Sequence, residues 1–194
     1  MGRYLSEAQL KAYGWSTTVN DLNDYTAAIL AAEQGLDNAC QRQIIVASAS
    51  SALSFRPEGW PSKTLWIRDC TAVASVVEYG ATLTADVDYV LEPIAAEQWS
   101  GEARPYDRIT KVNGAWTYDG PIPRVVVTAT WGWAAIPPGA VEACKVAAKA
   151  FLDGRDISFG LAGLTEGGGV SEREAKAVRD FIRDYRGHHS IGLA

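Results

Sequence analysis

The sequence predicts an α+β fold: mainly a helical bundle, with a β-rich insert between the second and third helices. Two observations predict it. Apolar residues recur at every third or fourth position towards both ends of the chain, as in helices that bury one face. Across the middle they alternate at every second position, as in half-buried strands. The length of 194 residues is usual for one domain with one core, so we expect a single domain.

The domain divides into five expected segments. They are two N-terminal helices (1–42), the β-rich insert (43–136), an alanine-rich core helix (137–157), a flexible linker (158–170), and a C-terminal helix with its tail (171–194). The linker is assigned from its glycines. No internal repeat is visible.

Local signals place the two N-terminal helices. Ser6 can cap the first while Gln9 reaches back to it, and Leu5 can pack on Leu10 as a hydrophobic staple. The second helix is expected from about Asn20. Its apolar positions recur at helical spacing and are Leu22, Tyr25, Ile29, Ala32, Leu36 and Ala39.

The β-rich insert contains several short alternating segments. The clearest strand runs from Val125 to Trp133, with Val125, Val127 and Ala129 on one face. Residues 95–123 are rich in Gly, Pro and Trp and predict a long loop or loose hairpin. Further strands are expected at 44–46, 64–67, 73–79 and 88–91.

Helical spacing returns after Pro137-Pro138. The apolar face of this alanine-rich helix is Val141, Cys144, Ala147, Ala148, Phe151 and Leu152. A second capping box, 171–174, opens the last helix. That helix has an apolar face of Val178, Phe181, Ile182 and Tyr185, and a face of mixed charge. Because a flexible linker precedes it, an amphipathic helix of this kind suits docking into a partner's groove.

Composition limits the classes of function. The chain has 23 acidic and 18 basic residues, a formal net charge of −5, which argues against a protein that coats nucleic acid. The three cysteines are far apart in the sequence, and we interpret them as small buried apolar side chains in a reducing compartment. The start of the chain lacks the apolar run of a signal peptide, and no stretch approaches the ~20 apolar residues of a membrane span. We therefore expect synthesis in a cytoplasm.

Candidate chemical motifs have simpler structural explanations. His188 and His189 lie in the expected tail, where no rigid neighbour can orient them as catalytic bases. The Gly-rich stretch 163–169 lacks the Lys-Ser/Thr ending of a phosphate loop. Asp86-Val87-Asp88 could hold a divalent metal but suits a polar turn better. We therefore expect no catalytic residues, no metal and no cofactor.

The seven tryptophans could form a surface that stacks on sugars or bases. They are Trp15, Trp60, Trp66, Trp99, Trp116, Trp131 and Trp133. Since they are spread over helix, strand and loop, core and subunit-contact roles are favoured.

The order of the elements carries a family resemblance. A helical pair runs from Tyr4 to Arg42, the segment 64–69 leads into the strand 73–79, and 125–138 passes from a strand through Trp131-Gly132 into a proline turn and an alanine-rich helix. This order resembles the head–tail connector, or adaptor, family of long-tailed, siphovirus-like bacteriophages. The resemblance spans nearly the whole chain, and each motif within it is loose.

The resemblance implies a non-enzymatic structural protein of the virion. Such proteins form a ring of about twelve copies beneath the portal, extend the DNA channel and offer a platform for the next neck protein. The implied partners are the portal, a downstream neck or stopper protein and further copies of the chain, without a membrane. DNA would pass through without specific binding. The implied location is the host cytoplasm during assembly and then the neck of the virion.

The C-terminal segment is implied to order on the portal. The residues expected to contact the portal are Phe159, Arg173, Arg179, Phe181, Ile182, Arg183 and Tyr185. One alternative is another neck protein, such as a stopper or tail-completion protein. A second is a carbohydrate-binding virion module, which would need Trp99 and Trp116 exposed beside polar groups. An enzyme comes third, because it would need a pocket with convergent titratable groups.

Overall fold

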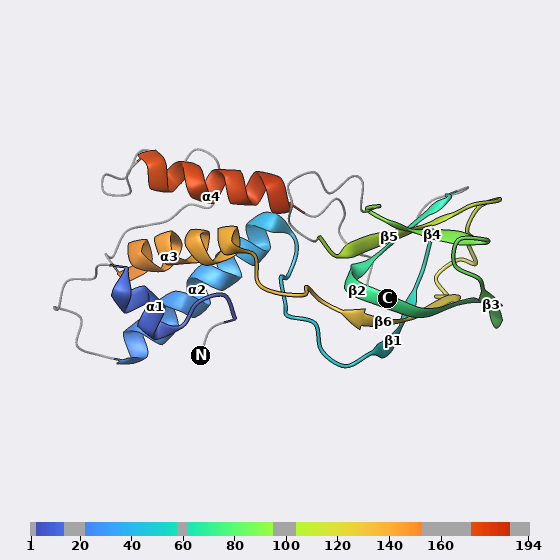
Figure 1. The fold of residues 1–194 in the computed structure, drawn as a ribbon, viewed down its shortest axis with the longest axis horizontal. Helices are drawn as coiled ribbons and strands as arrows, with labels where there is room; N and C mark the ends of the chain where they lie inside the picture. Colours follow the sequence, from blue (N-terminus) through green and yellow to red (C-terminus); the bar gives the residue numbers. More distant parts are fainter. Residues whose placement is uncertain (1–2, 14–21, 58–61, 95–103, 153–171, 187–194) are drawn as a thin grey trace. The chain divides into compact units, whose positions relative to one another are not determined.

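The structure is a computed structural model, and it describes residues 3–13, 22–57, 62–94, 104–152 and 172–186. These residues form two compact units (Figure 1). The helical unit contains the described residues up to Ile44 and from Ile136 onward, and the sheet unit contains those from Ile45 to Ala135.

The helical unit contains α1 (Glu7–Ala12), α2 (Leu22–Cys40), α3 (Pro138–Leu152) and α4 (Glu172–Tyr185). The predicted capping box of α1 is confirmed: Ser6 Oγ accepts a hydrogen bond from the backbone N–H of Gln9, and the Gln9 side chain accepts one from Ser6 N–H. In Figure 1, α3 lies between α2 and α4 and packs against both. The small side chains of α3 permit this close approach. Buried on α3 are Ala140, Ala143, Cys144, Val146, Ala147, Ala148 and Ala150.

The sheet unit is a six-stranded antiparallel sheet. Its strands are β1 (Ser51–Phe55), β2 (Thr64–Glu78), β3 (Ala81–Leu83), β4 (Tyr89–Glu92), β5 (Tyr106–Lys111) and β6 (Val125–Trp131). The strand order is β1-β6-β2-β5-β4, with β3 paired to β2. The predicted strand at 125–133 is confirmed over β6, whose Val125, Val127 and Ala129 are fully buried.

The long strand β2 curls the sheet. Its first half pairs with β5 and its second half with β6, and the register shifts at three places, between Trp66 and Cys70, Cys70 and Ala72, and Val73 and Ser75. Such bulges bend a strand and increase its twist. Glu78, at the end of β2, reaches Lys111 at the end of β5, with Nζ and Oε2 2.5 Å apart. Since β5 pairs with the start of β2, this ion pair shows that the two ends of β2 come together.

The expectation of a mainly helical bundle with a β insert is wrong. The chain is a more sheet-rich α+β protein, because residues 45–135 form a sheet with a core of their own. Segments 64–67 and 73–79 join into the single strand β2, and the expected loop 95–123 contains β5. Conversely, the expected strand 44–46 is reduced to one bridge between Val46 and Trp133. Local alternation could not reveal which segments share a core.

Candidate interaction surfaces

The described residues hold no cluster of three or more His, Cys, Asp or Glu side chains placed to bind a metal. The interpretation of the cysteines as buried apolar side chains is confirmed, since all three are buried and free. Burial raises the pKa of Cys40 and of Cys70 to about 12, and it also raises that of Cys144. Because the thiolate is the reactive form, these thiols serve packing. None of the described helices is both long and apolar enough to cross a bilayer.

The Asp86-Val87-Asp88 sequence forms a turn, as predicted. The Asp88 carboxylate accepts a hydrogen bond of 2.7 Å from the N–H of Thr84. The N–H of Asp86 donates to the carbonyl of Tyr89 at 2.8 Å, and Asp86 has a left-handed φ of 63°. This geometry uses Asp88 to fix the backbone before β4. His188, His189 and the stretch 163–169 lie outside the described residues.

Trp116 belongs to the core of the sheet unit. Trp116 is fully buried, and its indole N–H donates to the carbonyl of Ile109 at 3.3 Å. The ammonium of Lys111 lies 5.0 Å from the Trp116 ring centroid, so the Glu78–Lys111 pair closes over this ring. A sugar-binding surface needs Trp116 exposed, and that requirement is not met. Trp99, its expected companion, lies outside the described residues.

The apolar face predicted for α4 is turned into the helical unit. Phe181 and Tyr185 are buried and stack on each other with ring centroids 4.8 Å apart. Both rings lie over Gly139 of α3, since a Cβ built there would be 3.6 Å from Phe181 and 3.9 Å from Tyr185. Val178 is also buried, and Ile182 is half-buried. Phe181 and Tyr185 therefore pack against α3, so these two rings are not free on the surface of this structure.

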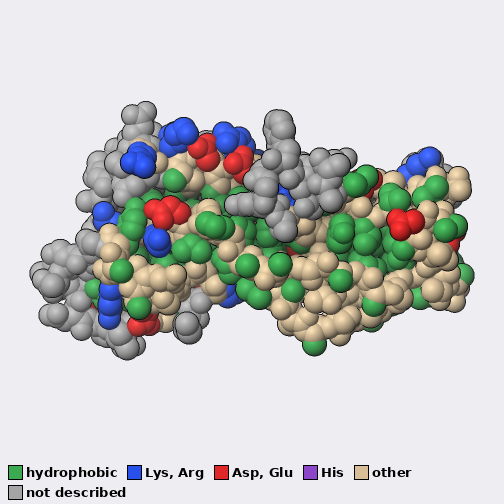
Figure 2. Space-filling view, viewed as in Figure 1, with side chains coloured by type: hydrophobic (Ala, Val, Ile, Leu, Met, Phe, Trp, Pro, Cys, Tyr) green, Lys and Arg blue, Asp and Glu red, His purple; other side chains and the backbone are tan. Residues whose placement is uncertain are grey.

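The outer face of α4 is a ridge of alternating charge, visible as blue and red side chains over this helix in Figure 2. Arg173 and Arg183 are exposed and Arg179 is half-buried. Asp180 lies 3.0 Å from both Lys176 and Arg183. The hydrogen bond from Lys176 lowers the pKa of Asp180. Of the residues predicted to dock, the three arginines thus lie together on this helix, whereas Phe159 lies outside the described residues.

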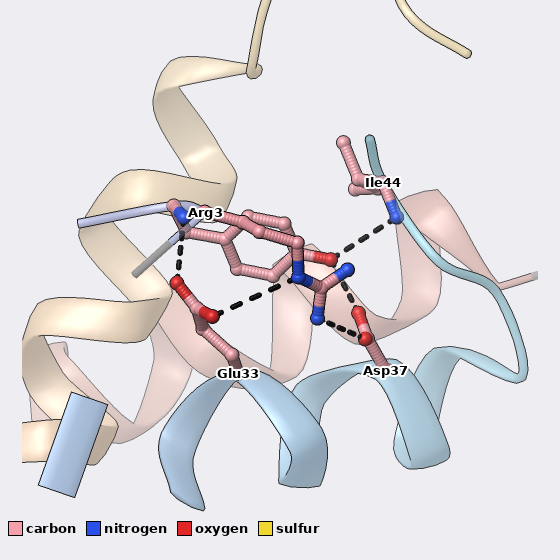
Figure 3. A network of polar contacts seen from close by, with 5 residues as sticks. Arg3, Glu33, Asp37 and Ile44 are labelled. Carbon is pink, nitrogen blue, oxygen red and sulfur yellow. Dashed lines mark hydrogen bonds and ion pairs between the residues drawn. The ribbon is translucent and has the colours of Figure 1, made fainter. Parts of the chain in front are cut away.

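A buried polar network holds the start of the chain on α2 (Figure 3). Two acidic residues one helical turn apart, Glu33 and Asp37, are 2% and 8% exposed. Arg3 forms an ion pair with Asp37 at 2.5 Å and approaches Glu33 at 3.8 Å. The backbone N–H of Tyr4 donates to Glu33 at 2.7 Å. Unpaired burial of these carboxylates would be costly, so the network compensates it.

The Tyr4 hydroxyl extends this network to Ile44, the last residue of the helical unit before the chain enters the sheet unit. It donates to Asp37 and accepts a hydrogen bond of 3.1 Å from the N–H of Ile44, where the chain leaves the unit. Burial and then the hydrogen bond to Asp37 raise the pKa of Tyr4. Sequence reasoning missed these residues. The only available signal was two carboxylates four residues apart on the apolar stripe of α2.

The segment Trp131-Gly132-Trp133, near the end of the sheet unit, is hydrogen-bonded to residues 45–47, near the start of the same unit. The N–H of Trp133 donates to the carbonyl of Ile45 at 2.7 Å, and its carbonyl accepts from Ala47 N–H at 2.8 Å. The Trp133 indole donates to Asp69 at 2.8 Å. Gly132 has a φ of 120°, and a Cβ there would lie 2.5 Å from the Ile45 carbonyl oxygen. Only glycine fits at position 132, where these two stretches of backbone lie against each other.

This fold is found in solved structures of gene transfer agent (GTA) particles. The chain is similar to one from the neck of a native GTA particle, computed with C12 symmetry, with a TM-score of 0.53 and 15% identity over 95% of this chain and 90% of the other. A second likeness is to the neck of an empty GTA particle, computed with C6 symmetry, with a TM-score of 0.54 and 15% identity over 97% and 92% of the two chains.

A third likeness is to a chain of the virion of a native GTA particle, with a TM-score of 0.55 and 17% identity over 97% and 92% of the two chains. No family model and no curated protein matches the sequence. At these identities the likeness establishes a shared fold along nearly the whole chain.

Proposed function

We propose that this chain is a structural subunit of the neck of a tailed, phage-like particle, and that within the neck it is the head–tail adaptor. The observation that carries the proposal is the fold shared with neck chains of GTA particles over 95–97% of the length. The order of motifs in the sequence supports the same role. A chain with this role would form a ring beneath the portal, continue the DNA channel and receive the next neck protein.

Ring formation is consistent with the symmetries of the similar chains, which come from necks computed with C12 and C6 symmetry. Copies in such a ring meet through two different patches, one on each side of the subunit, and the ring closes when the rotation between copies fits. The net charge of −5 suits a channel through which DNA slides, because acidic residues outnumber basic ones and repel the phosphates.

We assign the portal contact to the charged ridge of α4. Arg173, Arg179 and Arg183 lie on this ridge, while Phe181 and Tyr185 pack against Gly139 of α3. Guanidinium groups form bidentate hydrogen bonds with carboxylates, so the ridge suits an acidic surface on the portal.

The test is electron microscopy of portal rings mixed with this protein, beside portal rings alone. A second ring stacked on the portal is expected. The variant carrying Arg173→Glu and Arg183→Glu should bind the portal at least about tenfold more weakly, because two charge-assisted contacts are reversed. Lys63→Glu, a charge reversal at an exposed residue of the sheet unit, is the control. Bare portals with the wild-type protein would refute the adaptor role, and normal binding by the double variant would refute the role of α4.

A further inference from the structure

The strand β1 is an edge of the sheet, and among the described residues it pairs only with β6 (Figure 1). The hydrogen bonds at the two ends of β6 fix which of its backbone groups face β1. The carbonyl of Arg124 accepts from Tyr79 at the end of β2, and the N–H of Gly132 donates to Asp69 of β2. Successive residues of a strand point their backbone groups to opposite sides. Even-numbered residues of β6 therefore face β2, and odd-numbered residues face β1.

This alternation identifies the outward groups of β1. Ser51, Leu53 and Phe55 lie opposite the odd-numbered Ala129, Val127 and Val125, so their N–H and C=O groups point toward β6. The N–H and C=O groups of Ala52 and Ser54 point away from the sheet. Both residues are exposed, so four backbone hydrogen-bonding groups are accessible along this edge.

The β1 edge lacks the features that normally block strand addition. Such features are charged residues, prolines, very short strands and local turns that use the edge groups. β1 contains no charge and no proline over its five residues. Arg56 and Pro57 follow β1 much as Pro93 follows β4, so prolines do not distinguish the two edges. Within β4, however, the Tyr89 carbonyl is taken by Asp86 N–H, and the charged Glu92 is paired with Arg108 at 2.6 Å. The off-path strand β3 has only three residues.

We propose that the β1 edge receives an extended, uncharged strand from another protein of the neck, which adds to the sheet beside Ala52 and Ser54. This inference rests on the proposed function, and it adds a docking mode and a site for the downstream partner. Strand addition of this kind takes its affinity from main-chain hydrogen bonds and its specificity from alternate side chains. The small side chains of Ala52 and Ser54 leave room for larger side chains on the incoming strand.

Two other occupants fit the edge less well. Pairing β1 with β1 of a second copy would join two copies about a twofold axis, and such an isologous contact closes a dimer instead of building a ring. The β4 edge of a neighbouring copy is blocked by its own turn. DNA requires cations, and β1 carries none.

Hydrogen exchange resolved at single amides tests the site directly. The free protein should show slow exchange at Leu53 and Phe55 and fast exchange at Ala52 and Ser54. In intact purified particles, the amides of Ala52 and Ser54 should slow by at least about tenfold, since each would gain a hydrogen-bonding partner. In complexes made only from portal and this protein, those two amides should stay fast.

Each result of this comparison decides the proposal. Slowing already present in the portal complex would overturn the assignment to a further neck protein, because the occupant would then be the portal or a second copy. Fast exchange in the intact particle would overturn strand addition. Neither result affects the ring on the portal, which tests the adaptor role separately.

A variant test separates binding from folding. Ser54→Pro removes an N–H that β6 does not use, and proline is tolerated on the open side of an edge strand. We expect Ser54→Pro to keep the unfolding midpoint and the portal ring while reducing the yield of joined, infectious particles by about tenfold, the effect of about one hydrogen bond. Ser54→Ala keeps the N–H and is the matched control. Equal yields from the two variants would overturn the proposal.

Discussion

Replacing Gly132 with alanine should destabilise the sheet unit more than a change at any other glycine described here. The new Cβ would lie 2.5 Å from the Ile45 carbonyl oxygen and 2.9 Å from the Ala47 backbone N. Both atoms belong to backbone that is held by hydrogen bonds of 2.7 Å and 2.8 Å to Trp133. The segment therefore cannot move aside without breaking those bonds.

The magnitude follows from two costs. The loss of two backbone hydrogen bonds costs about 1 kcal/mol each. Holding alanine at the φ of 120° found for Gly132 costs a further 1–3 kcal/mol or so, because L-residues rarely adopt it. The free energy of unfolding should therefore fall by about 3–5 kcal/mol.

Gly114→Ala is the matched control for this experiment. Gly114 also has a positive φ, of 72°, but a Cβ there would meet nothing within 4 Å. Its substitution should cost only about 1 kcal/mol of backbone strain. Urea unfolding followed by tryptophan fluorescence gives both values. If the two variants lost the same stability, the close approach at Gly132 would not be the reason for glycine there.

Three further predictions concern the helical unit. The pKa values of Cys40 and Tyr4 are raised in the folded protein, so the unfolded chain loses these protons first as the pH rises. The stability contributed by Cys40 is therefore complete below about pH 9 and is lost between pH 9 and 12. Tyr4 adds to the loss above about pH 10. Urea unfolding at stepped pH under reducing conditions should show a decline of up to about 1.4 kcal/mol per pH unit for each such group, and a flat profile would contradict this. Arg3→Ala leaves the two buried carboxylates of α2 without their cation and should cost about 2 kcal/mol of unfolding free energy; a loss under 0.5 kcal/mol or so would argue against the network. Phe181→Ala removes a buried ring and should lower the free energy of unfolding, measured by thermal unfolding, by about 3 kcal/mol. Arg183→Ala, on the exposed face of the same helix, should change it by less than about 0.5 kcal/mol. Equal losses in the two variants would contradict the packing of α4 on α3.

Signals that act within a few residues predicted the structure well. The capping box at Ser6 and Gln9 is present as expected, and α3 begins at Pro138 as the proline turn indicated. The amphipathic pattern of α4 correctly identified Val178, Phe181 and Tyr185 as one apolar face. Such features depend on local geometry, which the neighbouring residues determine.

Long-range relations were not predictable in this way. β2 appeared as two strands because its bulges interrupt the alternation around Cys70. β5 was hidden because it lies in a Gly-, Pro- and Trp-rich segment, a composition typical of loops. The placement of Glu33 and Asp37 beside Arg3 also depends on how the chain start folds back on α2. Pattern alone does not specify such contacts.

The same limit applies to the candidate site. The sequence identified α4 as an amphipathic helix suited to docking, but it could not show that the apolar face packs on Gly139 of the same unit. That packing leaves the charged ridge on the outer face of the helix. The β1 edge was not identified either, because Ser51–Phe55 has little of the alternation that marks a strand.

The most direct test of the central claim is a cryo-electron microscopy reconstruction of the neck of the particle that carries this protein. The account predicts a closed ring of copies directly beneath the portal, with density that fits both the helical unit and the sheet unit. Density for this chain elsewhere in the particle, or a neck assembled without it, would contradict the account.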